Sequence, residues 1–220
     1  PSRDNWGPLV VPDGHYFVYW KDDKYQAYDL DAGTSKTIGA SSPVSFVDVE
    51  FDHPGPKPSF GVEGYSADMK SVLVEHQYDL WALPLDGSAP RNLTNGIGTT
   101  GQIRFRLVRS EPIDSTARRA VRSGQLFDLA KPVTVSAYGE YTKKAGFYRL
   151  TGKDLKEIVY DDAIFTTPAR AAKAERFLYT RQTFVEFPDL RVSSGDFKDA
   201  RKISNVNPQQ AEYAWGHRVL

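Results

Sequence analysis

A pattern of short β-strands recurs four times along this sequence, and it constrains the fold more than any other feature. In each unit a turn with an acidic or small residue precedes an apolar strand, which leads to a second strand, a polar turn and a third strand. Short β-branched and aromatic runs separated by Gly, Pro, Asn and Asp are typical of strands joined by turns, so an all-β chain is predicted. The apolar strands are expected at residues 15–20, 71–76, 132–138 and 177–181, and the strands that follow them at 25–30, 80–85, 146–150 and 189–193.

The spacing of the repeat indicates which all-β architecture forms. An apolar residue marks the last strand of each unit, and successive marks are 55, 65 and 45 positions apart. The marks are Ile38, Leu93, Ile158 and Ile203. One blade of a β-propeller takes roughly 40–50 residues, so we predict about four four-stranded antiparallel sheets that form β-propeller blades. Propellers close with roughly 4–8 blades, and the spacing alone does not say whether the ring is complete.

The long third interval predicts an insertion between blade strands. Residues 115–122 supply it, and three arginines cluster there: Arg118, Arg119 and Arg122. Such a segment forms either a short helix or a solvated loop, and the loop is favoured.

Composition excludes several classes of function. The 220 residues are 40% hydrophobic, enough for one sizeable core, and 28 basic residues balance 28 acidic ones. Zero net charge argues against nucleic acid and charged membrane surfaces as partners. The chain has no cysteine, so disulfides, Cys-ligated zinc, iron–sulfur clusters and a thiol nucleophile are excluded. No stretch approaches the ~18 apolar residues of a membrane span, and no membrane partner is expected.

No motif in the chain predicts a catalytic serine. A hydrolase nucleophile needs a Gly-x-Ser-x-Gly turn, because small flanking residues permit its strained geometry. The nearest match is Gly64-Tyr65-Ser66-Ala67-Asp68, where a carboxylate replaces the second glycine. This segment lies at the entry to an apolar strand, so an ordinary turn is the better interpretation of Ser66. No catalytic residue is predicted.

Metal and cofactor sites are not predicted either. Asp29-x-Asp31-x-Gly33 resembles the first half of a calcium loop but lacks the distal Glu, and a hairpin turn is favoured. Asn92-Leu93-Thr94 fits a glycosylation acceptor, yet the repeat explains it as the end of a blade. The histidines are scattered without the close spacing of a metal pair: His15, His53, His76 and His217.

Three stretches resemble the serine peptidases of the prolyl oligopeptidase family, which carry an N-terminal propeller and a C-terminal α/β-hydrolase domain. Residues 66–70, followed by Asp79-Leu80-Trp81 and by 91–96, look like one blade of such propellers. Residues 127–147 are more specific, and 207–216 look like the segment that leaves the last blade for the hydrolase domain. The resemblance covers essentially the whole chain and is strongest from Ser66 onward.

The resemblance implies a non-catalytic role for this chain. Residues 1–206 would be propeller blades in an incomplete ring, and 207–220 would begin the linker to a catalytic domain that the chain lacks. In this family the propeller filters the access of peptides to the catalytic domain, so that domain and peptide substrates are the expected partners. The chain alone is expected to have no peptidase activity and no cofactor. Bacterial members are often periplasmic or secreted, and a cytoplasmic location stays open.

Two other functions remain as alternatives. A stand-alone propeller could serve as a scaffold for protein interactions, in which case the ring should close within the chain. A propeller enzyme with catalytic groups at its central channel has no clustered motif in its favour. If the ring is incomplete, the first and last sheets lose the neighbours that cover their apolar faces, and self-association through these faces is expected.

Overall fold

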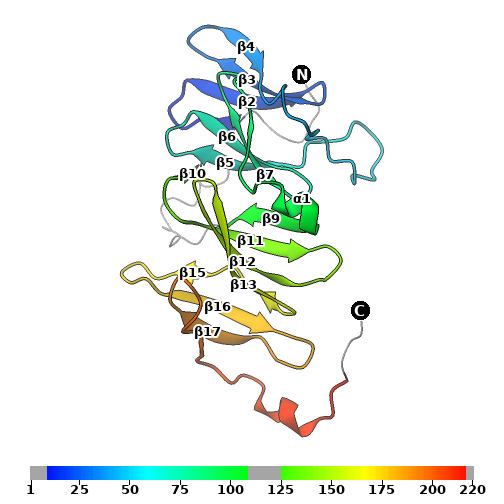
Figure 1. Cartoon of the computed structure of the whole chain (residues 1–220), viewed down its shortest axis with the longest axis vertical. Coiled ribbons are helices and arrows are strands. Elements are labelled where there is room, and N and C mark those ends of the chain that lie inside the picture. Colours follow the sequence, from blue (N-terminus) through cyan, green and yellow to red (C-terminus); the bar gives the residue numbers. More distant parts are fainter. Residues whose placement is uncertain (1–8, 109–124, 217–220) are drawn as a thin grey trace.

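Four β-sheets follow one another along the long axis of the molecule (Figure 1). The computed structural model describes residues 9–108 and 125–216. The first sheet contains β1 (Leu9–Val10), β2 (Tyr16–Lys21), β3 (Lys24–Asp29) and β4 (Thr34–Thr37). The second contains β5 (Val62–Ser66), β6 (Ser71–Glu75), β7 (Leu80–Pro84) and β8 (Arg91–Asn92). The predicted all-β class is confirmed.

The remaining elements complete the stack. The third sheet contains β9 (Ile103–Leu107), β11 (Val133–Gly139), β12 (Ala145–Thr151) and β13 (Asp154–Asp161). The fourth contains β14 (Ile164–Phe165), β15 (Ala169–Arg170), β16 (Phe177–Gln182), β17 (Asp189–Ser193) and β18 (Arg201–Lys202). A short strand, β10 (Leu126–Phe127), joins the second sheet. Residues 9–108 and 125–216 include two one-turn helices, α1 (Ile97–Gly101) and the 3₁₀-helix η1 (Pro208–Glu212).

The strand predictions hold closely. The apolar strands of the repeat are β2, β6, β11 and β16, and the strands that follow them are β3, β7, β12 and β17. Local turn chemistry explains the accuracy. Asp22 and Asp23, with φ angles of 50° and 59°, form the two-residue turn between β2 and β3, and only such left-handed residues match the twist of a tight hairpin.

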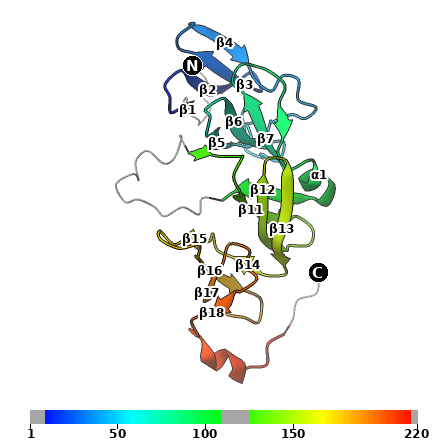
Figure 2. The same ribbon diagram turned by 60° about the vertical axis from the view of Figure 1, so that its left-hand side comes forward.

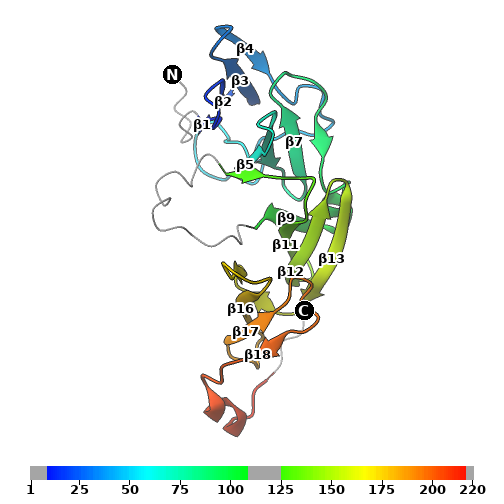
Figure 3. The same ribbon diagram turned by 90° about the vertical axis from the view of Figure 1, so that its left-hand side faces the viewer.

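Each sheet is a propeller blade. Consecutive strands lie side by side in chain order, so the first strand of each sheet lies on one side of the stack and the last strand on the other (Figure 3). The first and fourth sheets lie at opposite ends of the stack (Figures 1 and 2). Within the described residues the four blades therefore form an open array, as expected for an incomplete ring.

Apolar cores fill the space between consecutive sheets. Trp20 and Tyr25 of the first sheet pack edge-on at 4.9 Å and contact the β6 and β7 side chains of the second sheet. On the opposite face of β6, Leu73 joins Phe105 and Tyr148 in the core between the second and third sheets. Tyr179 and Phe147 share the core between the third and fourth. An inner blade therefore needs apolar residues on both faces, which explains the continuous apolar run of β6.

A buried aspartate begins the third strand of two blades. The Asp79 carboxylate accepts hydrogen bonds from Thr94 Oγ1 at 2.5 Å and from the Gly98 and Thr99 amides at 3.0 and 3.1 Å. These bonds tie β7 to the segment after β8 and to α1. Sequence analysis did not predict α1, because its single turn depends on this carboxylate rather than on an amphipathic repeat.

The fourth sheet repeats this arrangement at Asp189. Its carboxylate accepts hydrogen bonds from Ser204 Oγ at 2.6 Å and the Val206 amide at 2.9 Å, and Lys202 Nζ lies at 2.5 Å. The bonds from Lys202 and Ser204 lower the pKa of the Asp189 carboxyl to about 2. The group therefore stays ionised, and its bonds persist, well below the pH at which an ordinary aspartate is protonated.

One predicted element lies outside the described residues. The insertion at 115–122, with its arginines Arg118, Arg119 and Arg122, falls in the segment 109–124. Strand β10, at Leu126–Phe127, follows the predicted insertion and pairs in parallel with β5. The second sheet thus has a fifth strand, where only antiparallel strands were predicted, because β10 pairs with the preceding blade.

Replacing Asp79 by asparagine tests the buried anchor. In D79N an amide NH₂ group replaces one carboxylate oxygen. This group cannot accept the hydrogen bonds that the Gly98 and Thr99 amides donate to the carboxylate, so we expect the free energy of unfolding to fall by about 2 kcal/mol. Equilibrium urea denaturation measures this loss. The control is D86N, because the exposed Asp86 accepts the Ser88 amide in a surface turn. Equal losses in the two variants would contradict the anchoring role.

Candidate functional site

The strand β10 connects two blades on their first-strand side. The chain leaves β9 of the third sheet, and β10 then pairs with β5 of the second before β11 begins. The Tyr65 amide donates to the Gln125 carbonyl and the Ala67 amide to the Phe127 carbonyl, both at 2.8 Å. These bonds satisfy an edge that would otherwise present unpaired backbone groups.

Gly64 allows β10 to approach this closely. A Cβ atom at this position would lie 2.4 Å from the Gln125 carbonyl oxygen, which is closer than non-bonded atoms can come. The Phe127 ring lies against the same position at 3.1 Å. The first glycine of the incomplete nucleophile motif therefore has a packing role.

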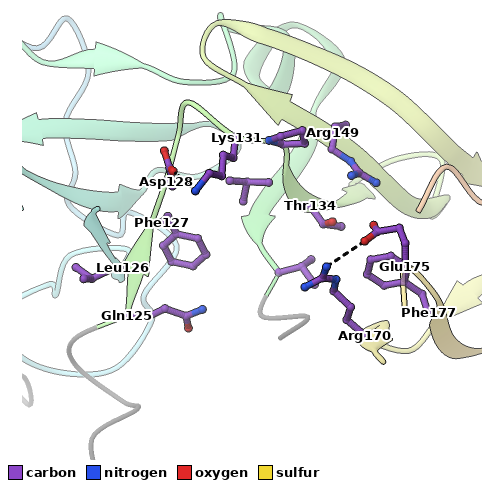
Figure 4. Close-up of a pocket in the computed structure, with 13 residues that line it drawn as sticks. Gln125, Leu126, Phe127, Asp128, Lys131, Thr134, Arg149, Arg170, Glu175 and Phe177 are labelled. Atoms are coloured by element: carbon purple, nitrogen blue, oxygen red, sulfur yellow. Dashed lines mark hydrogen bonds and ion pairs between the residues drawn. The ribbon is translucent and has the colours of Figure 1, made fainter. Parts of the chain in front are cut away.

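A cleft of about 390 Å³ lies where β10 meets the third and fourth sheets (Figure 4). Leu126 and Phe127 of β10 form one wall. Thr134 and Arg149 line it from the third sheet, and Phe177 lines it from the fourth, together with Arg170 of β15 and with Glu175. The cleft thus combines apolar walls with polar groups from three separate elements, as small-ligand sites do.

The charges that line the cleft do not cancel. Lys131 Nζ pairs with Asp128 Oδ2 at 2.9 Å, and Arg170 Nη2 pairs with Glu175 Oε2 at 3.0 Å. The hydrogen bond from Lys131 lowers the pKa of the Asp128 carboxyl. Arg149 supplies a third positive charge (Figure 4).

Arg149 carries the excess charge. Its Nη2 donates to the Gly195 carbonyl, and its buried Nε has no hydrogen-bond partner. Among the residues that the structure describes, no carboxylate forms an ion pair with it. A guanidinium held by a single backbone carbonyl can still bind a carboxylate or another planar anion.

A second charged cluster lies between the second and third sheets, and its arginine is already paired. Arg106 Nε lies 2.6 Å from Glu75 Oε2, and both side chains are about three-quarters shielded from solvent. Burial raises the pKa of Glu75 and lowers that of Arg106. Glu63 Oε1 accepts the Leu107 amide at 2.9 Å. This cluster joins two blades, and its arginine is not available to an anionic ligand.

Ser66 lies in a turn between β5 and β6. Its hydroxyl donates to Asp68 Oδ1 at 2.5 Å and accepts the Ser71 amide at 3.0 Å. The bond from Ser66 lowers the pKa of the Asp68 carboxyl. Asp29 has a similar local role, because its Oδ1 accepts the Ala32 amide at 2.9 Å in the turn after β3.

The histidines do not come together. His15 Nδ1 lies 2.5 Å from Asp31 Oδ2 on the surface, and this hydrogen bond raises the pKa of His15. His76 packs against aromatic rings, and its burial lowers its pKa. His53 is exposed, and His217 lies outside the described residues. Within residues 9–108 and 125–216, no group of three His, Asp or Glu side chains could hold a metal ion.

The cleft leaves little trace in the sequence. Its only local signal is Arg149, a charged residue within the apolar strand Phe147-Tyr148-Arg149-Leu150. The other walls come from β10 and β15, which have two residues each and no detectable periodicity. No helix among the described residues is long and apolar enough to cross a membrane.

Comparison with known proteins gives distant structural likenesses. No protein-family model and no curated protein sequence matches the chain. TolB from Acinetobacter baumannii shares 13% identity at a TM-score of 0.44, over 91% of this chain and 44% of that one. A putative TolB from Agrobacterium tumefaciens shares 12% identity at a TM-score of 0.37, over 89% of this chain and 79% of that one. A puromycin hydrolase shares 16% identity at a TM-score of 0.46, over 90% of this chain and 32% of that one. This chain therefore spans less than half the length of the Acinetobacter baumannii TolB and of the puromycin hydrolase.

Substitution of Gly64 tests the position of β10. In G64A the added methyl group collides with the Gln125 carbonyl, so β10 should separate from β5. Hydrogen exchange should then show faster exchange of the Tyr65 and Ala67 amides, by about tenfold or more. The control is G152A, because Gly152 also has positive φ but nothing lies within 4 Å of its added methyl group. Unchanged protection in G64A would contradict the assigned contact.

Proposed function

We propose that this chain is the non-catalytic propeller segment of a serine peptidase of the prolyl oligopeptidase type, and that it controls the access of peptides to a catalytic domain. The sequence motifs in 66–96, 127–147 and 207–216 support this proposal, together with four consecutive blades. The observation that carries it is the position of the positively charged cleft on the first-strand side of the stack. That side borders the central channel in a propeller.

The cleft suits a peptide that enters along the channel. Leu126, which is 41% exposed, offers apolar surface to a side chain, and Arg149 offers a guanidinium to a peptide carboxylate. Bidentate pairing with a carboxylate is the geometry in which arginine binds most strongly. The cleft would therefore retain peptides by their acidic or C-terminal group.

The C-terminal segment supports the proposed domain division at residue 206. After β18 the chain runs through η1 and extends past the fourth sheet (Figure 1). Tyr213 and Trp215 are 66% and 50% exposed, with ring centroids 6.4 Å apart. Adjacent exposed aromatic rings are typical of surfaces that a partner covers, and the catalytic domain is the proposed partner. A periplasmic or secreted location belongs to the same proposal.

Peptide binding tests the proposed role of the cleft. We expect a fluorescein-labelled tetrapeptide with a free C-terminal carboxylate to bind more tightly than its C-terminal amide, as measured by fluorescence anisotropy. Arg149→Gln should weaken binding of the free acid about tenfold and leave binding of the amide unchanged, because one charge-assisted hydrogen bond pair is lost. The control is Arg176→Gln, which removes an exposed arginine paired with Asp199. Equal affinity for acid and amide would contradict the proposal.

Active-site labelling tests the non-catalytic role. We expect no reaction of the chain with a fluorophosphonate probe, because in the described residues the Ser66 hydroxyl is bonded to Asp68 and the Ser71 backbone rather than to a histidine. Gel fluorescence detects the labelled product. Labelling that is lost in Ser66→Ala would show that the chain itself is catalytic.

A further inference from the structure

The first sheet presents an aromatic face that no other described sheet covers. Strand register places Val10 opposite Phe17 and Phe17 opposite Tyr28, so these side chains share one face with Tyr19. The opposite face carries Trp20 and packs on the second sheet. On the uncovered face the Phe17 and Tyr28 rings stack at 5.0 Å, and Val10 is 52% exposed.

The fourth sheet presents an aliphatic face at the other end of the stack. Leu178 lies opposite Val192, and the Ile203 amide donates a hydrogen bond to the Leu190 carbonyl. Leu190 and Val192 are two positions apart in β17, so all four side chains share one face. Leu178, Leu190 and Ile203 are 41%, 40% and 50% exposed. The segment 207–216 extends past this face without covering it, since these side chains remain exposed. The buried Phe177 and Tyr179 point the other way, toward the third sheet.

The two uncovered faces have complementary chemistry. Between the second and third sheets, an aliphatic face with Leu73 and Leu80 packs on a face that carries Phe105 and Tyr148. The aliphatic face of the fourth sheet points to where a following blade would lie, just as the aliphatic face of the second sheet points to the third. The aromatic face of the first sheet points to where a preceding blade would lie. Pairing the fourth sheet of one copy with the first sheet of another therefore repeats a packing that the molecule already uses.

We propose that two copies of this chain associate head to tail, the fourth sheet of each packing on the first sheet of the other. A heterologous contact forms a closed ring if its rotation closes and an open filament if it does not. Two copies place eight sheets in one ring, within the roughly 4–8 blades at which propellers close. Closure removes both uncovered faces at once, and this inference does not depend on the proposed peptidase partner.

A stable association needs a contact of sufficient area, and specific interfaces bury about 800 Å² on each partner. The aromatic rings Phe17, Tyr19 and Tyr28 are already partly buried, so the more exposed aliphatic residues, at 40–52%, contribute much of the area. Three aromatic and five aliphatic side chains face this contact, and a closed pair forms it twice. Neither face carries an acidic strand residue, and the uncharged neighbours of the apolar set are Gln26, Ser35, Thr180 and Gln182. Arg201 lies opposite Val192 on the fourth-sheet face, and Lys21 pairs with Lys24 at the end of the first-sheet face. These long side chains can keep their charged ends in water at the rim of the contact.

Solution mass tests the association. Light scattering at ~100 µM should give twice the 24.7 kDa of one chain. Val10→Glu and Ile203→Glu each place a negative charge among the apolar residues of one face, and each should weaken association at least tenfold. Both positions are at least half exposed, so the variants should fold, and circular dichroism checks this. The control is Tyr141→Glu, which alters a 73% exposed aromatic residue in the β11–β12 turn. A single-chain mass for the unaltered protein would overturn the proposal.

Mixing the two variants tests the head-to-tail arrangement. Neither variant alone has an intact pair of faces, but the Val10→Glu chain keeps its fourth-sheet face and the Ile203→Glu chain keeps its first-sheet face. Native mass spectrometry should therefore detect a mixed pair held by one intact contact, in which tags of different mass identify both chains. Association of either variant with itself would show that like faces pair, and would overturn the proposed arrangement.

Discussion

Face-to-face packing of consecutive sheets is the interaction on which the rest of this structure depends. The described residues contain no long helix and no disulfide, so burial between sheets supplies the cohesion. Aromatic side chains such as Trp20, Phe105 and Tyr179 fill the space between adjacent sheets. Each sheet contacts only the sheets next to it, so the packing can continue at both ends of the array. An open array therefore leaves two apolar faces on which another blade could pack.

The buried aspartates serve a different purpose from the apolar cores. Apolar packing is non-directional and tolerates sliding, whereas the bonds that Asp79 makes fix the end of β7 relative to α1 and to the segment after β8. Asp189 does the same for the last blade with Ser204. Asp79 precedes Thr94 by 15 positions, and Asp189 precedes Ser204 by the same interval. This shared spacing is a blade signature that composition and periodicity alone do not show.

The crossover of β10 links stability to the candidate site. By pairing with β5 it closes an exposed edge, and by leaving the third sheet to do so it forms one wall of the cleft next to Arg149. A wall made from a neighbouring blade gives the cleft a shape that one blade alone could not provide. The same inner side of the stack would line a channel if a second copy completed the ring, so ring closure and peptide selection would involve one surface.

The sequence by itself determined the strands, their order and the all-β class, because these depend on local turn chemistry and on side-chain alternation. Both signals lie within a few residues of the chain. Examples are the turn residues Asp22 and Gly152, which have positive φ, and the apolar run of β6. Three features could not be predicted in this way: the pairing of β10 with β5, the bonds around Asp79, and the cleft around Arg149. Each joins segments that lie far apart along the chain, and their meeting depends on how the sheets stack. Tertiary structure decided them, because the distance between two such segments is set by packing between blades and leaves no periodic trace in either segment.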